Sequence, residues 1–190
     1  MAERQLRADA RRNRERVLAA AREAFAESGV GVPLDEIASR AGVGAGTVYR
    51  HFPTKEALFE AVMVARVQDL VADARARVSA ANPGEALFGL LARIGDEAAA
   101  KRDVSDALDG AGVDPDGVLA GIIGELHAAL AALLARAQRD GSVRADVGPG
   151  DLVALLKGLR ATVRASDDPG LPARLLAVLS DGLRPPTSSG

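Results

Sequence analysis

The hydrophobic positions along this chain recur at spacings of three and four residues, which is typical of amphipathic helices. Between residues 12 and 28, for example, Val17, Leu18, Ala21 and Phe25 form one apolar stripe, and Gly29 follows where the helix should end. No stretch alternates with a period of two for long enough to predict a strand. The pattern therefore predicts an all-α protein.

Glycine and proline positions divide the chain into about nine predicted helices. We expect them at residues 12–28, 33–41, 44–52, 55–80, 85–101, 103–109, 115–140, 151–165 and 172–183. The fourth helix should span roughly 40 Å, because an α-helix rises about 1.5 Å per residue, so it is long enough to leave one domain and enter another. We expect one domain at residues 1–55, a second at 56–184 and a disordered tail at 185–190.

Residues 34–55 have the spacing of a helix-turn-helix. This motif needs a small residue where its helices cross, a residue that tolerates positive φ in the turn, and an apolar residue behind the second helix. Ala38, Gly42 and Val48 meet these three needs. The remaining apolar contacts are expected from Ile37, Ala41, Val43 and Phe52.

The second helix of this motif has an outer face that core packing explains poorly. The positions expected to point outward are Ala45, Gly46, Thr47, Tyr49, Arg50 and His51. Together they present hydroxyl, phenol, guanidinium and imidazole groups on one short helix. Such a face is well explained by contact with a DNA groove.

The run GVGAGTVYRHFPTKEALFEAV resembles the DNA-binding signature of TetR-family transcriptional regulators, G-V-x-x-G-[TS]-[LVI]-Y-x-H-F-x-[ST]-K-E-x-L. The resemblance covers Leu34 to Val62, and the helix before it also fits. It implies an N-terminal three-helix helix-turn-helix domain, joined by a long fourth helix to a helical effector-binding and dimerisation domain. The chain departs from the family at Gly44, where many members carry a Ser or Thr cap, and at Ala45, which offers only a methyl group, for example to thymine.

The resemblance implies DNA contacts from the outer face of the recognition helix and from the start of the next helix. The expected DNA-binding residues are Ala45, Gly46, Thr47, Tyr49, Arg50, His51 and Lys55. Lys55 is expected to hold a phosphate at a helix N-terminus, and the two-pronged donor set of Arg50 is suited to guanine. Arg11 and Arg12, with Arg4 and Arg7 before them, belong either to a solvated terminus or to an arm on the DNA.

The resemblance also implies an effector pocket between the fourth and eighth helices. Its candidate lining residues are Met63, Val67, Phe88, Leu91, Ile94, Ile123, Leu126, His127 and Leu130. An ordinary core position is the alternative for each of them, and the pattern favours it. Polarity distinguishes His127 from the rest. The effector is expected to be small and apolar or amphipathic, because aromatic residues and inward charges are scarce.

A homodimer through the last two helices is the third implication. The candidate interface residues are Leu152, Leu156, Leu159, Val163, Leu175 and Leu179. Alternatively, these two helices only cover the rest of their own domain. Lys157, Arg160 and Arg164 lie along one line of the eighth helix. This line is interpreted as a solvated face, or alternatively as an edge of the dimer interface or a contact for an anionic ligand.

Composition argues against an enzyme and against a metal or cofactor. The chain has no Cys, which excludes thiolate metal sites and disulfides, and only two His, and it shows neither a nucleophile elbow nor a phosphate loop. Asp103, Asp106 and Asp109 suggest an acidic helix face, for which a metal is a remote alternative. The absence of a signal peptide and of any run near the ~18 apolar residues of a membrane span predicts a cytoplasmic protein without a membrane partner.

Charge is distributed unevenly along the chain. Residues 1–55 carry ten Lys and Arg against seven Asp and Glu, whereas residues 56–190 carry fourteen against nineteen. A basic end on an acidic body suits a protein that meets phosphates at one end. Together with this charge distribution, the resemblance to TetR-family regulators implies a homodimeric repressor that binds palindromic double-stranded operator DNA and is released by an effector. The alternative is a helix-turn-helix regulator without an effector, acting constitutively or under the control of a partner protein.

Overall fold

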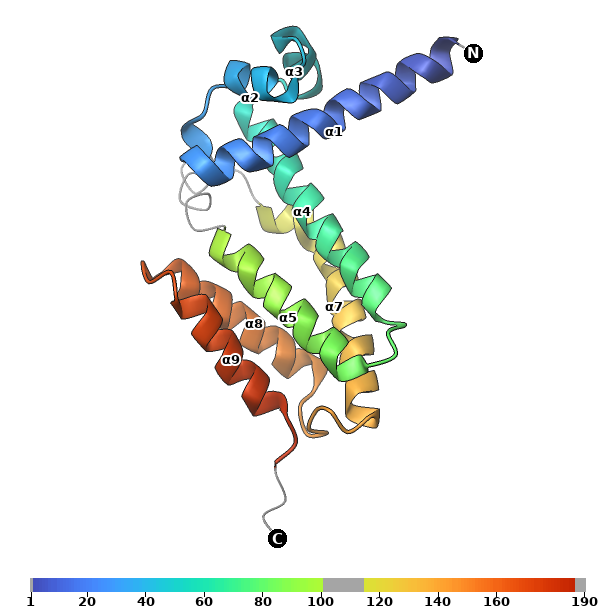
Figure 1. The fold of residues 1–190 in the computed structure, drawn as a ribbon, viewed down its shortest axis with the longest axis vertical. Coiled ribbons are helices and arrows are strands. Elements are labelled where there is room, and N and C mark those ends of the chain that lie inside the picture. The colour runs from blue at the N-terminus through green and yellow to red at the C-terminus, as the bar shows by residue number, and fades with distance from the viewer. Residues whose placement is uncertain (1, 101–114, 187–190) are drawn as a thin grey trace. The chain divides into compact units, whose positions relative to one another are not determined.

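The computed structural model describes residues 2–100 and 115–186, and within these ranges every regular element is a helix (Figure 1). The all-α prediction is confirmed. The predicted helix at 103–109, with Asp103, Asp106 and Asp109, lies outside the described residues, as do the last four residues of the predicted tail. The chain forms two compact units that divide between Arg66 and Val67.

The first unit is built on α1 (Ala2–Ser28), which a short 3₁₀ turn, η1 (Gly29–Gly31), brings to an end. α1 begins ten residues before the predicted start at Arg12, so Arg11 and Arg12 belong to a helix and not to an extended arm. The hydrophobic pattern missed this part of α1 because its turns have no apolar stripe. Ion pairs along the helix, Arg12 with Asp9 and Arg11 with Glu15, support it instead.

The helix-turn-helix consists of α2 (Leu34–Ala41) and α3 (Ala45–His51), as predicted to within one residue. Gly42 joins them with φ of +61°, the left-handed conformation for which glycine is suited. The backbone N–H of Val43 donates to the Ala38 carbonyl at 3.1 Å and closes the end of α2. From α1, the guanidinium of Arg16 donates to the Gly42 carbonyl at 2.9 Å, so the turn is also held from outside the motif.

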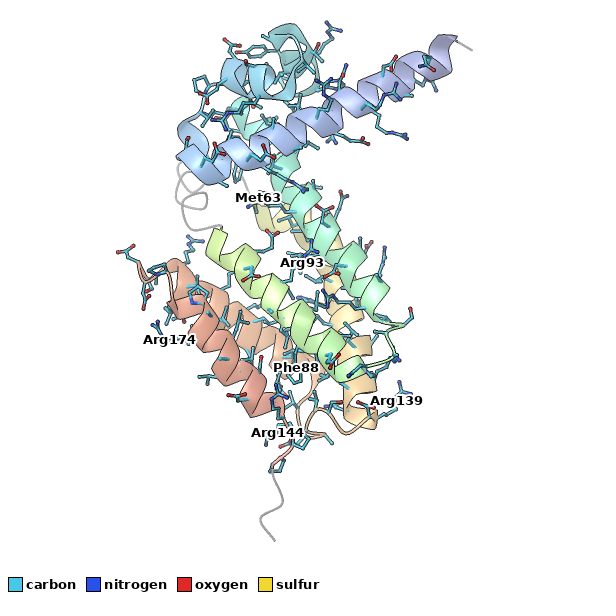
Figure 2. All side chains as sticks on the ribbon, in the orientation of Figure 1. Met63, Phe88, Arg93, Arg139, Arg144 and Arg174 are labelled. Carbon is cyan, nitrogen blue, oxygen red and sulfur yellow. The ribbon has the colours of Figure 1, made fainter. Side chains whose placement is uncertain are left out.

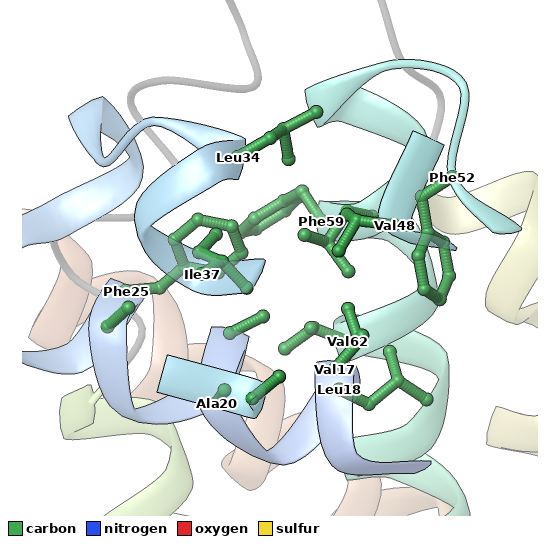
Figure 3. Close-up of a cluster of buried hydrophobic side chains, with 14 of the residues drawn as sticks. Val17, Leu18, Ala20, Phe25, Leu34, Ile37, Val48, Phe52, Phe59 and Val62 are labelled. Atoms are coloured by element: carbon green, nitrogen blue, oxygen red, sulfur yellow. The ribbon is translucent and has the colours of Figure 1, made fainter. Parts of the chain in front are cut away.

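The core of the first unit holds α2 and α3 against α1 and the start of α4 (Lys55–Arg77), as the close-up in Figure 3 shows. Ile37 and Val48 are fully buried. Phe25 of α1 meets Phe59 of α4 with ring centroids 5.7 Å apart. Met63 is also part of this core, so the unit extends further along α4 than the predicted boundary at residue 55.

The second unit contains the rest of α4 with α5 (Pro83–Ala100), α7 (Pro115–Arg139), α8 (Pro149–Arg164) and α9 (Leu171–Leu183). α5 packs against α8 and α9, which also pack against each other (Figure 1). The largest buried side chains of its core include Leu87, Leu90, Leu130, Leu133 and Leu134.

Arginine side chains hold the ends of these helices. Arg136 of α7 donates to the carbonyls of Val78 and Ala80, which follow the end of α4; the bond to Ala80 is 2.8 Å long. Arg144, labelled in Figure 2, donates from its guanidinium to the Gly182 carbonyl at 3.3 Å. The Nε of the same guanidinium donates to the Asp146 carboxylate at 2.6 Å. Cations at helix carboxyl ends complement the helix dipole.

Among the described residues, the part of α7 from Leu119 to Arg139 is a helix that could cross a membrane, judged by its length and composition alone. This finding corrects the expectation that no stretch approaches such a span. Mostly buried core helices pass the same test, whereas 28% of the apolar window of this helix is buried; Leu133, Leu134 and Ala137 belong to the core of the second unit.

Candidate functional site

The outer face of α3 carries the polar side chains that the sequence placed there. Val48 is fully buried and fixes the rotation of the helix. Tyr49, 48% exposed, lies on the open side together with the exposed residues Ala45, Gly46 and Arg50. Thr47 and His51 are half-buried at its edges. An exposed Tyr beside an exposed Arg places an amphipathic ring and a guanidinium on one face, which suits a surface that a ligand covers.

The basic groups of this face are available to an anion. Within residues 2–100 and 115–186, neither Arg50 nor Lys55 forms an ion pair with a carboxylate. Gly44 precedes α3 as its cap in an extended conformation and, having no side chain, leaves the first N–H groups of the helix without a side-chain acceptor.

The start of α4 favours negative charge. The Thr54 hydroxyl accepts a hydrogen bond from the Ala57 N–H at 3.1 Å, which caps the helix. The pKa of Glu56 is lowered, chiefly because its own backbone N–H donates to the carboxylate, then by Thr54 and by the charge of Lys55. The Glu56 carboxylate already accepts a hydrogen bond at the positive end of the α4 dipole. A phosphate bound here would therefore depend on the Lys55 ammonium and on the remaining backbone N–H groups.

The basic residues of α1 are exposed but already paired. Arg11 lies 3.6 Å from Glu15, and Arg12 is bound to Asp9. Any phosphate contact by these two residues must therefore compete with a carboxylate on the same helix. Exposed pairs of this kind are weak, so the exchange costs little.

The second unit encloses a cavity of about 150 Å³ with mainly apolar walls. Its lining residues come from α5, α7, α8 and the second-unit part of α4, and they are Val67, Leu70, Ile94, Glu97, Leu119, Ile123, Leu126, His127, Leu130, Val153, Leu156, Lys157, Leu159 and Arg160.

Six of the nine predicted pocket residues line this cavity: Val67, Ile94, Ile123, Leu126, His127 and Leu130. Met63 lies in the core of the first unit. Leu91 is buried in the second core, and Phe88 of α5, labelled in Figure 2, lies under the guanidinium of Arg184 at 4.8 Å.

Sequence reasoning left open that Lys157 and Arg160 contact an anionic ligand, but it did not include the face of α8 among the predicted walls of the pocket. Val153, Leu156, Lys157 and Arg160 follow the spacing of one helix face, and all four line the cavity. That spacing was visible in the sequence, but the same helix has two further apolar faces, and the pattern alone does not say which face meets α7.

The six residues predicted for the dimer interface differ in exposure within one chain. Leu152, Leu159 and Val163 are buried in the second unit, whereas Leu156, Leu175 and Leu179 are half-buried. The large apolar side chains left open are Leu155 on α8, 48% exposed, and Val178 on α9, 71% exposed. Neither of these two was singled out from the sequence.

The chain is similar to known regulators over both units. The sequence profile of bacterial regulatory proteins of the tetR family matches residues 17–62, and that of the transcriptional regulator SbtR-like C-terminal domain matches residues 82–185. A TetR transcription regulatory protein from Mycobacterium vanbaalenii is 48% identical, with a TM-score of 0.77 over 95% of this chain and 99% of that one. A TetR transcriptional regulator from Streptomyces coelicolor is 37% identical, with a TM-score of 0.74 over 92% and 99%.

Two curated relatives match about a third of the chain. The HTH-type transcriptional regulators TtgW and SrpR from Pseudomonas putida are each 42% identical over 67 residues, which is 35% of this chain. The matched part spans 50% of TtgW and 32% of SrpR, so it covers no more than half of the length of either relative.

Proposed function

Because this chain belongs to the TetR family of bacterial transcriptional regulators, we propose that it is a repressor that inserts α3 into the major groove of an operator. The observation that carries this proposal is the exposed face of α3, where Tyr49 and Arg50 stand open while Val48 anchors the helix in the core. Membership of a family of regulators also supports the interpretation that the chain is not an enzyme.

Each residue of the face has a proposed role. Arg50 reads a guanine with its two-pronged donor set, and Thr47, Tyr49 and His51 contact the backbone or the groove edge. The methyl group of Ala45 and the backbone at Gly46 allow close approach to the bases. Lys55 binds a phosphate beside the capped start of α4.

The working unit is proposed to be a two-fold homodimer formed by α8 and α9. Leu155 and Val178 support this proposal because large apolar side chains are costly to leave in water. A two-fold dimer would read a palindrome with half-sites about 34–36 Å apart or a multiple of that spacing.

A small molecule bound in the cavity of the second unit is proposed to release the operator. The support is a cavity of about 150 Å³ bounded by α5, α7, α8 and α4, the helix whose first residues also complete the core of the first unit. A coupling of about 1–3 kcal/mol between effector and operator would change operator affinity roughly 5–150-fold. The alternative, a regulator without an effector, predicts no such coupling for any compound.

The DNA-binding proposal is tested by selecting bound sequences from random duplex DNA with the purified full chain and its Ala45→Glu variant. Ala45 is the exposed first residue of α3, a position where the helix dipole stabilises a carboxylate. In the proposed complex the same carboxylate would face the phosphates of the DNA. We expect the wild type to enrich a palindrome, and the variant to be at least as stable in urea but to lose DNA binding. Ala72→Glu, on an exposed position of α4 in the second unit, is the matched control.

Enrichment of the same palindrome by Ala45→Glu would mean that α3 does not face the DNA. Failure of the wild type to enrich any sequence, under low salt where non-specific binding is measurable, would contradict sequence-specific recognition.

A further inference from the structure

The cavity of the second unit is asymmetric in charge, and this asymmetry bears on the class of its ligand. Ten of its fourteen lining residues are Leu, Ile or Val, which form the interior walls. The four polar lining residues are Glu97 of α5, His127 of α7, and Lys157 and Arg160 of α8. Lys157 and Arg160 are exposed, so the cavity reaches the surface where these two cations stand.

The two cations are positioned to act on one group. They are three residues apart on α8, so they lie on the same helix face with Cβ atoms about 5–6 Å from each other. Neither forms an ion pair with a carboxylate in the part of the chain that the structure describes. Glu97 takes part in an interaction of its own, and the formal charges of Glu97, Lys157 and Arg160 sum to one net positive charge.

From this arrangement we propose that the effector is an amphipathic monocarboxylate, with its apolar part in the cavity and its carboxylate between Lys157 and Arg160. This inference rests on the proposed release by a small molecule and specifies the ligand. One negative charge balances the site, and a carboxylate accepts hydrogen bonds from a guanidinium and an ammonium together. A neutral apolar molecule would fill the same cavity but would leave both cations without an anionic partner.

The size of the cavity limits the apolar part. An apolar cavity of about 150 Å³ accommodates a benzene ring, so the buried portion should contain about six carbon atoms. Each methylene placed in the cavity should strengthen binding about fourfold until the space is filled. Hexanoate and benzoate fit these limits, and chains much longer than octanoate should gain nothing further.

Isothermal titration of the full-length chain with hexanoate, hexanol and hexylamine tests the proposed ligand class. We expect hexanoate to bind more tightly than hexanol, and hexylamine to bind most weakly. Lys157→Gln with Arg160→Gln should weaken hexanoate roughly tenfold and leave hexanol unchanged, because two exposed charge contacts are removed and the walls are not. Lys157→Glu with Arg160→Glu should bind hexylamine more tightly than hexanoate.

Two controls separate the charged mouth from the apolar walls. Arg164→Gln removes a cation from α8 that does not line the cavity, and should leave hexanoate binding unchanged. Ile123→Phe narrows the cavity and should weaken hexanoate and hexanol alike. Circular dichroism establishes that each variant is folded, and the charge variants are at exposed positions where folding is not at risk.

The proposal is overturned if hexanoate and hexanol bind equally well to the wild type, if neither binds, or if the double Gln variant retains wild-type affinity for hexanoate. Operator affinity is measured separately with the selected palindrome. Binding with the expected charge dependence but without any change in operator affinity would support the ligand class, and would contradict the release mechanism alone.

Discussion

At the scale of single residues, Arg50 and Lys55 should contribute differently to operator binding. Arg50 stands exposed on α3, where it is proposed to read a base, whereas Lys55 begins α4, where it is proposed to bind a phosphate. Arg50→Ala should cost about 1–3 kcal/mol and relax the preference at one position of each half-site. Lys55→Ala should weaken binding to every sequence alike and reduce the slope of log affinity against log salt by about one.

Fluorescence anisotropy with the selected palindrome and with single-base variants, over a range of salt concentrations, distinguishes the two roles. An equal loss on every sequence for Arg50→Ala would assign this residue to the backbone. Arg139→Ala, at an exposed position near the end of α7, is the control that should change neither quantity.

At the scale of elements, the start of α4 depends on Thr54. Its hydroxyl accepts the hydrogen bond from Ala57, and it also supports the Glu56 carboxylate. Thr54→Ala should lower the free energy of unfolding by about 0.5–2 kcal/mol, as is usual for the loss of a helix cap. Thr54→Ser keeps a hydroxyl at the same position and should retain most of the stability. Urea denaturation measures both, and equal stability of all three proteins would mean that this cap is not needed.

At the scale of the whole molecule, dimerisation and operator binding should be lost together. Val178→Asp places a carboxylate on the most exposed large apolar side chain of α9, where a second copy is proposed to pack. Burial of an unpaired charge is costly, so the variant should become monomeric while remaining folded, because position 178 is open to solvent within one chain. Light scattering measures the mass, and anisotropy measures operator binding.

The predicted interface residue Leu152 makes a useful contrast. Leu152→Asp should unfold the second unit instead of only separating two chains, because Leu152 is fully buried within its own core. A dimeric Val178→Asp protein would place the interface on another surface.

Local sequence determined the helix-turn-helix almost completely. Gly42, Ala38 and Val48 act within one short segment, and their spacing allows few other arrangements; the turn, the buried face of α3 and its exposed face follow. The same holds for most helix ends, where glycine and proline act on the backbone within one turn. The beginning of α1 was missed because its residues form a helix without an apolar stripe, and hydrophobic periodicity was the signal in use.

Only the tertiary structure decided which face of α8 is buried, which face lines the cavity and which face is exposed. This helix has apolar residues on several faces, and periodicity describes each face without naming its neighbour. Packing against α5, α7 and α9 buries Leu152 and Val163, turns Leu156, Lys157 and Arg160 toward the cavity, and leaves Leu155 outside. Neighbours distant along the chain therefore determine both the charged mouth of the cavity and the exposed apolar surface, because burial depends on how whole helices meet and not on the order of residues within one of them.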